Sequence, residues 1–128
     1  LGHLQYWGLS PAFNFLEGIA GGTVKVLLTG CSDVRHILKT LCDVCLTDKF
    51  KSVEVYFHET SKELICRALL LLHVIHEQNL NFDERVELFL DLYGNALVKE
   101  KTAKYLNSVV PDILNLIHDE PKTVTVLK

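Results

Sequence analysis

The chain has 128 residues, of which 48% are hydrophobic and 23% are charged, and its formal net charge is −3. This composition is typical of a folded globular domain and excludes an intrinsically disordered chain. The acidic balance and the lack of a basic stripe exclude binding to a nucleic-acid backbone. The longest apolar run, residues 68–72, is far shorter than the roughly 20 residues that cross a bilayer, so we expect no membrane partner.

The sequence contains no methionine and four cysteines. Without an initiator residue, we expect residues 1–128 to form a single N-terminal domain that is a fragment of a longer chain. Cys42 and Cys45 form a C-x-x-C pair on the apolar stripe of a predicted helix, and no second pair follows at zinc spacing. We therefore expect buried free thiols, which fit a reducing cytosol, and no metal site.

The first 22 residues read as an irregular arm followed by a connector. Two adjacent aromatic residues, a glycine and a Ser-Pro step at residues 6–11 oppose a helix, and Trp7 and Phe13 are the expected anchors of the arm. Residues 17–22 contain three glycines, which predict a flexible connector.

The stretch from residue 24 to residue 45 predicts a strand, a turn and a helix. Residues 24–28 form a short apolar run that suits a strand buried on both faces. Gly30 provides the turn. Apolar residues then recur at helical spacing from residue 34 to residue 45, and Ser32 or Asp33 can cap this helix.

A strand, a glycine turn and a capped helix are the opening of a doubly wound α/β unit, which aims backbone N–H groups at a ligand crevice. Gly30, Ser32 and Asp33 are therefore candidate cofactor-binding residues. The motif typical of a dinucleotide site is G-x-G-x-x-G, whereas this loop contains one glycine. A simple turn is the alternative interpretation.

A second strand is predicted near residues 53–57, because apolar and polar residues alternate over residues 53–59. It should pair in parallel with the first strand through a right-handed crossover. Glu59 follows this strand, where Rossmann-type domains hold a ribose hydroxyl, and is a fourth candidate cofactor-binding residue. A solvated loop glutamate is the alternative. Thr60 and Glu63 form a capping box for a helix over about residues 61–78.

The second half of the chain is predicted to be helical. Asn81 and Glu84 can cap a helix whose apolar residues lie on one stripe, and a further helix over about residues 101–119 should kink or restart at Pro111. The stripe of the helix that begins at Asn81 consists of Phe82, Val86, Phe89, Leu90, Tyr93 and Leu97. Residues 123–127 are predicted to form a last strand. The fold class is therefore α/β, a Rossmann-like partial parallel sheet with flanking helices.

Few residues fit a catalytic set. His73, His76 and Glu77 form H-x-x-H-E, but zinc proteases need H-E-x-x-H with histidines four residues apart. No G-x-S-x-G elbow and no phosphate-binding P-loop motif occur. His36 lies one turn from the glycine loop, and nothing in the sequence orients it. We predict no catalytic residue.

Three segments resemble the N-terminal domain of the axonemal dynein assembly factor 3 family: YWGLSPA at residues 6–12, VLLTGCSDVRHIL at residues 26–38 and FLDLYGNAL at residues 89–97. The resemblance implies a cytoplasmic protein, several times longer than this chain, that helps preassemble dynein arms for motile cilia. Its implied partners are dynein arm subunits and other assembly factors or chaperones. It also implies a domain distantly like a class I methyltransferase.

These considerations predict a non-enzymatic assembly factor that acts through protein contacts and has no cofactor. The alternative is an S-adenosylmethionine-dependent methyltransferase, or a degenerate nucleotide-binding domain, that uses Gly30 and Glu59.

Overall fold

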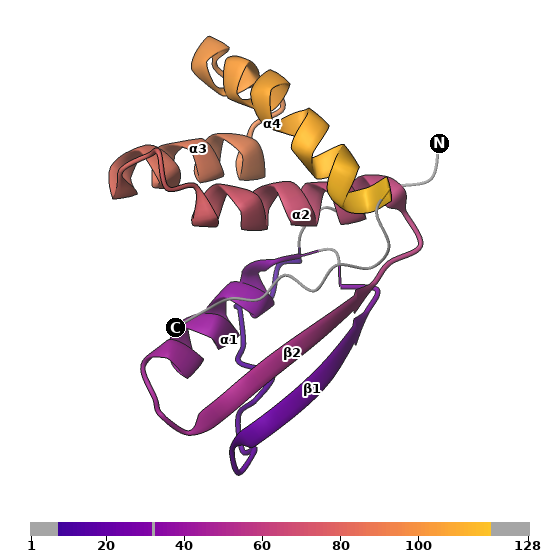
Figure 1. The fold of residues 1–128 in the computed structure, drawn as a ribbon, viewed down its shortest axis with the longest axis vertical. Coiled ribbons are helices and arrows are strands. Elements are labelled where there is room, and N and C mark those ends of the chain that lie inside the picture. The colour runs from indigo at the N-terminus through magenta and orange to yellow at the C-terminus, as the bar shows by residue number, and fades with distance from the viewer. Residues whose placement is uncertain (1–7, 32, 119–128) are drawn as a thin grey trace. The chain divides into compact units, whose positions relative to one another are not determined.

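A computed structural model describes residues 8–31 and 33–118 of the chain (Figure 1). Its element order confirms the predicted α/β class and the helix-rich second half. The predicted strand over residues 123–127 lies outside the described residues. The chain forms two compact units, which divide between Ala68 and Leu69, inside the second helix. The elements are β1 (Gly22–Thr29), α1 (Arg35–Cys45), β2 (Phe50–His58), α2 (Lys62–His76), α3 (Phe82–Gly94) and α4 (Glu100–His118).

The two described strands pair in parallel, as predicted. Val24 lies opposite Val53, and Thr29 lies opposite His58. Because the strands run in the same direction, the turns that follow them lie at one edge of the sheet. This edge carries the predicted cofactor-binding residues.

The core of the first unit lies on one face of the sheet. Leu16, Val44 of α1 and Phe50 form a buried cluster, against which Val24 and Val53 pack. Residues alternate between the two faces of a strand, and the other face is exposed, with 66% exposure at Leu27 and 51% at Tyr56. The prediction that β1 is buried on both faces is therefore wrong among the described residues.

The glycine-rich connector makes a defined backbone contact where it enters β1. The N–H of Gly22 donates to the carbonyl of Lys49 at 3.1 Å. Gly21 has φ of +108°, and a Cβ at this position would lie 2.3 Å from the same carbonyl oxygen. Only glycine fits here, because any side chain would overlap with the Lys49 backbone.

The starts of α2 and α3 are capped differently. The hydroxyl of Ser61 accepts the N–H of Leu64 at 3.4 Å and donates to Glu63. The predicted capping box of Thr60 and Glu63 is therefore wrong by one residue. At α3 the predicted box is confirmed, since Asn81 and Glu84 each accept the other's backbone N–H.

The second unit contains the last part of α2 together with α3 and α4. Of the kink or restart predicted at Pro111, the restart is wrong, because α4 continues as one helix through this residue. A proline can be accommodated there at the loss of one helical hydrogen bond. Among the described residues, no helix combines the length and apolar character needed to cross a membrane. The buried apolar residues of this unit are Leu71, Val74, Leu88, Val109 and Ile113.

The apolar stripe of α3 is present but faces outward. Phe82, Val86 and Leu90 are exposed, and we call these three residues the α3 stripe. Leu97, which was predicted on the same stripe, lies after the end of α3 and is also exposed. The buried positions of α3 are instead Leu88 and Asp91. The helical period was correct, and part of the predicted stripe lies on the exposed side of α3.

Candidate functional site

The candidate site is the sheet edge where β1 and β2 end. Gly30 adopts φ of +61°, in the left-handed region that favours glycine, and its N–H donates to the carbonyl of His58 at 3.0 Å. Because His58 precedes Glu59, this bond places Gly30 and Glu59 at neighbouring strand ends. The structure thus brings together two of the predicted site residues. Ser32, a third, lies outside the described residues.

Glu59 is partly buried and is engaged locally. One of its carboxylate oxygens accepts the N–H of Thr60 at 2.9 Å and the Thr60 hydroxyl at 3.3 Å. These bonds fix the turn between β2 and α2. They orient the carboxylate toward its own backbone, so a ribose hydroxyl would have to share this acceptor.

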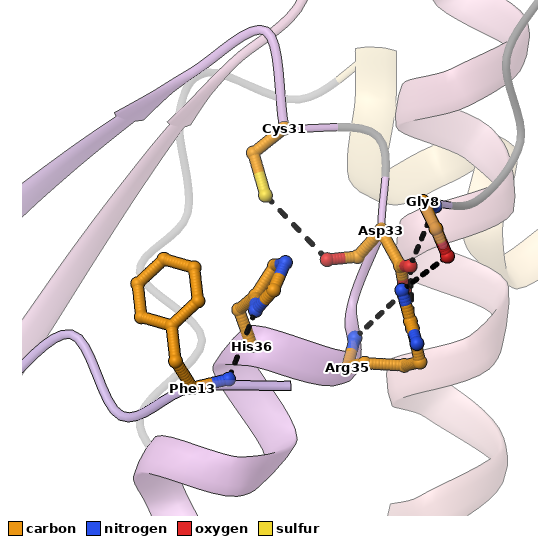
Figure 2. Close-up of polar contacts among 6 residues, drawn as sticks. All are labelled: Gly8, Phe13, Cys31, Asp33, Arg35 and His36. Atoms are coloured by element: carbon orange, nitrogen blue, oxygen red, sulfur yellow. Dashed lines mark hydrogen bonds and ion pairs between the residues drawn. The ribbon is translucent and has the colours of Figure 1, made fainter. Parts of the chain in front are cut away.

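Asp33, the fourth predicted residue, is buried and holds the start of α1. One carboxylate oxygen accepts the N–H of Arg35 at 3.0 Å. The other accepts Nε of Arg35 at 2.5 Å and the N–H of Gly8 at 3.2 Å, as Figure 2 shows. Nη2 of Arg35 donates to the carbonyl of Gly8 at 2.7 Å. Asp33 and Arg35 therefore bind the N–H and the carbonyl of Gly8, respectively. We call these three residues the arm latch.

The electrostatics of the arm latch favour an ionised Asp33. Burial alone would raise the pKa of Asp33, but the hydrogen bonds from Arg35 and Gly8 outweigh it and hold the pKa below its ordinary value. A negative charge thus already lies at the positive end of α1. An anionic ligand at the same helix end would meet a like charge.

His36 is oriented by the N-terminal arm. Its Nδ1 accepts the N–H of Phe13 at 3.2 Å, and the two rings lie 4.3 Å apart between centroids (Figure 2). Because Nδ1 accepts, the neutral ring carries its proton on Nε2. No sequence pattern predicts this contact, because the two residues are 23 positions apart.

Cys31 follows the glycine turn directly, but its environment does not activate its thiol. Burial, followed by the charges of Asp33 and Glu59, raises the pKa of the Cys31 thiol, which opposes the thiolate needed for nucleophilic attack. Cys42 and Cys45 are exposed, so the prediction that they are buried is wrong. Among the described residues, no group of three histidines, cysteines or carboxylates is placed to hold a metal ion.

A separate hollow of about 410 Å³ lies in the second unit, at the turn between α2 and α3. Arg85 reaches into this turn, where its Nη1 donates to the carbonyl of Ile75 at 3.0 Å. The lining is mostly polar and contains none of the predicted site residues. It consists of Ile75, His76, Glu77, Gln78, Leu80 and Arg85.

Comparison with known proteins identifies the chain. Residues 6–98 match the family described as a domain of unknown function, DUF4470. The chain belongs to this family. No solved structure matches it. The match covers the arm latch, the glycine turn, both strands and α3, so these features belong to the DUF4470 region.

Several relatives of this DUF4470 chain carry the name dynein axonemal assembly factor 3. The protein from Xenopus tropicalis is 39% identical over 89% of the chain, and that from Xenopus laevis is 34% identical over 90%. The mouse protein is 30% identical over 91%. The aligned regions make up 29%, 26% and 22% of these relatives, so the chain spans about a quarter of their length. Homology to this group of proteins is thus shown, as the resemblance of the three segments predicted.

Proposed function

We propose that this chain is part of a cytoplasmic factor that preassembles axonemal dynein arms for motile cilia and acts through protein contacts. The observation that carries the proposal is the homology, over about nine-tenths of the chain, to proteins named dynein axonemal assembly factor 3. The proposed partners are dynein arm subunits and other assembly factors or chaperones.

The geometry of the candidate site supports a binding role over catalysis. Asp33 and His36 are both engaged by the N-terminal arm, and Glu59 is engaged by Thr60. A general acid or base must reach a substrate proton at hydrogen-bond distance. Here the titratable groups nearest the glycine turn hold the protein's own backbone. We therefore propose that the chain is not an enzyme.

The test is deletion of the gene in multiciliated cells, followed by re-expression of the full-length protein. We expect deletion to lower the amount of dynein heavy chain in the cytoplasmic fraction and to leave cilia immotile, and we expect re-expression to restore both. Tubulin of the axoneme is the control, and its amount should not change. Stable heavy chains and motile cilia after deletion would refute the proposal.

The order of strand, glycine turn, helix and parallel strand favours a second proposal about ancestry. We propose a Rossmann-like unit, distantly like a class I methyltransferase, in which the nucleotide site around Gly30 and Glu59 is vestigial. Calorimetric titration of the full-length protein with S-adenosylmethionine tests this. We expect no heat of binding. Micromolar binding that is lost in Glu59→Ala would support the methyltransferase alternative.

A further inference from the structure

We propose that the α3 stripe binds an amphipathic helix of a partner protein that carries lysine or arginine beside its apolar residues. Phe82 is 71% exposed, Val86 40% and Leu90 59%. They recur every four residues, so they form one continuous row along the helix. With 13 residues, α3 is about 20 Å long, which matches a partner helix of three to four turns.

The exposure of this row is not explained by the packing of α3. The helix buries a different side, through Leu88 and Asp91, against the rest of its unit. Scattered single apolar residues on a surface are ordinary, but a row of three at helical spacing is the pattern by which helices dock into one another. The adjacent Phe89 stacks on Tyr93 at 5.7 Å between ring centroids, which extends the apolar surface.

The charge beside the row selects the kind of partner. Asp83 and Glu87 each follow a stripe residue by one position, so they form an acidic border along it. Asp83 is exposed. Glu87 forms an ion pair with Lys99 in which both side chains are more than half exposed. Such a pair between exposed side chains contributes little to stability, so Glu87 can exchange Lys99 for a cation on a partner.

The same border disfavours the other occupants of an apolar row. A two-fold pair of this chain would bring the same patches together and set acidic border against acidic border. A membrane surface with anionic lipids would repel it. A helix with basic residues beside its apolar stripe, on the side that meets Asp83 and Glu87, complements both the row and the border.

The experiment is fluorescence anisotropy with two labelled synthetic helices and the 128-residue chain. Both peptides carry leucine at positions i, i+3, i+4 and i+7, and lysine borders the leucines in one and glutamate in the other. We expect the lysine peptide to bind at least about tenfold more tightly. Leu90→Gln should weaken its binding about tenfold or more. Leu114→Gln, at a half-exposed position on α4, is the matched control and should leave binding unchanged.

Asp83→Asn separates charge from apolar contact. This variant should weaken binding of the lysine peptide about threefold and reduce its dependence on salt. Circular dichroism checks that each variant is folded. Equal affinity for the two peptides, or unchanged binding in Leu90→Gln, would overturn the proposal. A dimer in analytical ultracentrifugation that Leu90→Gln dissolves would also overturn it, in favour of self-association.

The inference rests on the proposed function only in taking the partner to be a component of dynein assembly. The peptide measurement contains no such component. Its failure would therefore leave the assembly role standing, whereas failure of the deletion experiment would leave the helix-binding surface standing without that role.

Discussion

Asp33 in the first unit and Asp91 in the second are both almost completely buried, with 5% and 3% exposure, and each joins a loop to a helix. Their hydrogen-bond donors differ. Asp33 meets the guanidinium of Arg35 together with backbone N–H groups. Asp91 meets neutral donors, namely the hydroxyl of Thr102 at 2.5 Å, the side-chain amide of Asn95 and the N–H of Lys99 at 3.0 Å.

The difference shows two ways of fixing a loop with one carboxylate. At Asp33 a charge is balanced by a charge, so removal of either partner leaves the other poorly compensated. At Asp91 the carboxylate is stabilised by dipoles, so the loss of one donor leaves two in place. The arm latch should therefore be the more sensitive of the two to a single substitution.

The largest effect is expected for Asp33→Ala. It removes the acceptor of three hydrogen bonds and leaves the Arg35 guanidinium without its carboxylate. Because the Arg35 side chain is 28% exposed, water relieves part of the cost. We expect the free energy of unfolding to fall by about 3 kcal/mol, measured by urea denaturation.

The matched control for Asp33→Ala is Asp112→Ala, which removes an exposed carboxylate on α4. It should change the free energy of unfolding by less than about 0.5 kcal/mol. If both variants lose the same stability, the arm latch does not hold the first unit.

Arg35→Lys should have the next largest effect. Lysine keeps the charge but lacks the fork with which Arg35 reaches both Asp33 and the Gly8 carbonyl. We expect a loss of about 1.5 kcal/mol in urea denaturation. The N–H of Gly8 should also exchange faster with solvent deuterium. A variant as stable as the parent chain would show that charge alone is sufficient.

Thr102→Val tests the neutral set around Asp91 and should have a smaller effect. It removes one donor and preserves the shape of the buried side chain, while the bonds from Lys99 and Asn95 remain. We expect a loss of about 1 kcal/mol. Thr102→Ser keeps the hydroxyl and is the control for hydrogen bonding. A loss greater than that of Asp33→Ala would reverse the comparison between the two units.

Local features of the fold were predictable because their cause lies in neighbouring residues. A short apolar run predicted the first strand, alternation predicted the second, and the spacing of Asn81 and Glu84 predicted the cap of α3. Ser32 or Asp33 was expected to cap α1, but the N-cap is Val34, which makes no side-chain cap hydrogen bond; Asp33, one residue earlier, accepts the N–H of Arg35. Because such contacts join residues only a few positions apart, a sequence pattern can predict them.

The rest depended on contacts between distant positions. Gly8 and Arg35 are 27 residues apart, and no periodicity links them. Periodicity also shows which residues share a side of a helix but not whether another element covers that side. For this reason Cys42 and Cys45 were expected to be buried and are exposed, and the spacing of the α3 stripe did not reveal that this side of the helix is uncovered.

The smallest effect is the dependence of stability on pH, which both aspartates contribute to. Hydrogen bonds from Thr102, Lys99 and Asn95 lower the pKa of Asp91, and those from Arg35 and Gly8 lower that of Asp33 despite its burial. In the unfolded chain both carboxyl groups take up protons near their ordinary pKa of 3.8. In the folded chain their pKa values are lower, so both carboxylates are still ionised at that pH. Their stabilisation is therefore complete above this value and is lost as the pH falls below it.

Asp33→Asn and Asp91→Asn should each flatten this dependence, because each removes one group that the unfolded state protonates first. The measurement is the free energy of unfolding at several pH values between about pH 5 and about pH 3, where the parent chain should lose stability more steeply than either variant. Thr102→Ser should retain the parent slope, since Asp91 keeps its donors. Parallel curves for the parent chain and Asp33→Asn would mean that Asp33 binds protons equally in both states, which would remove the charge balance from the arm latch.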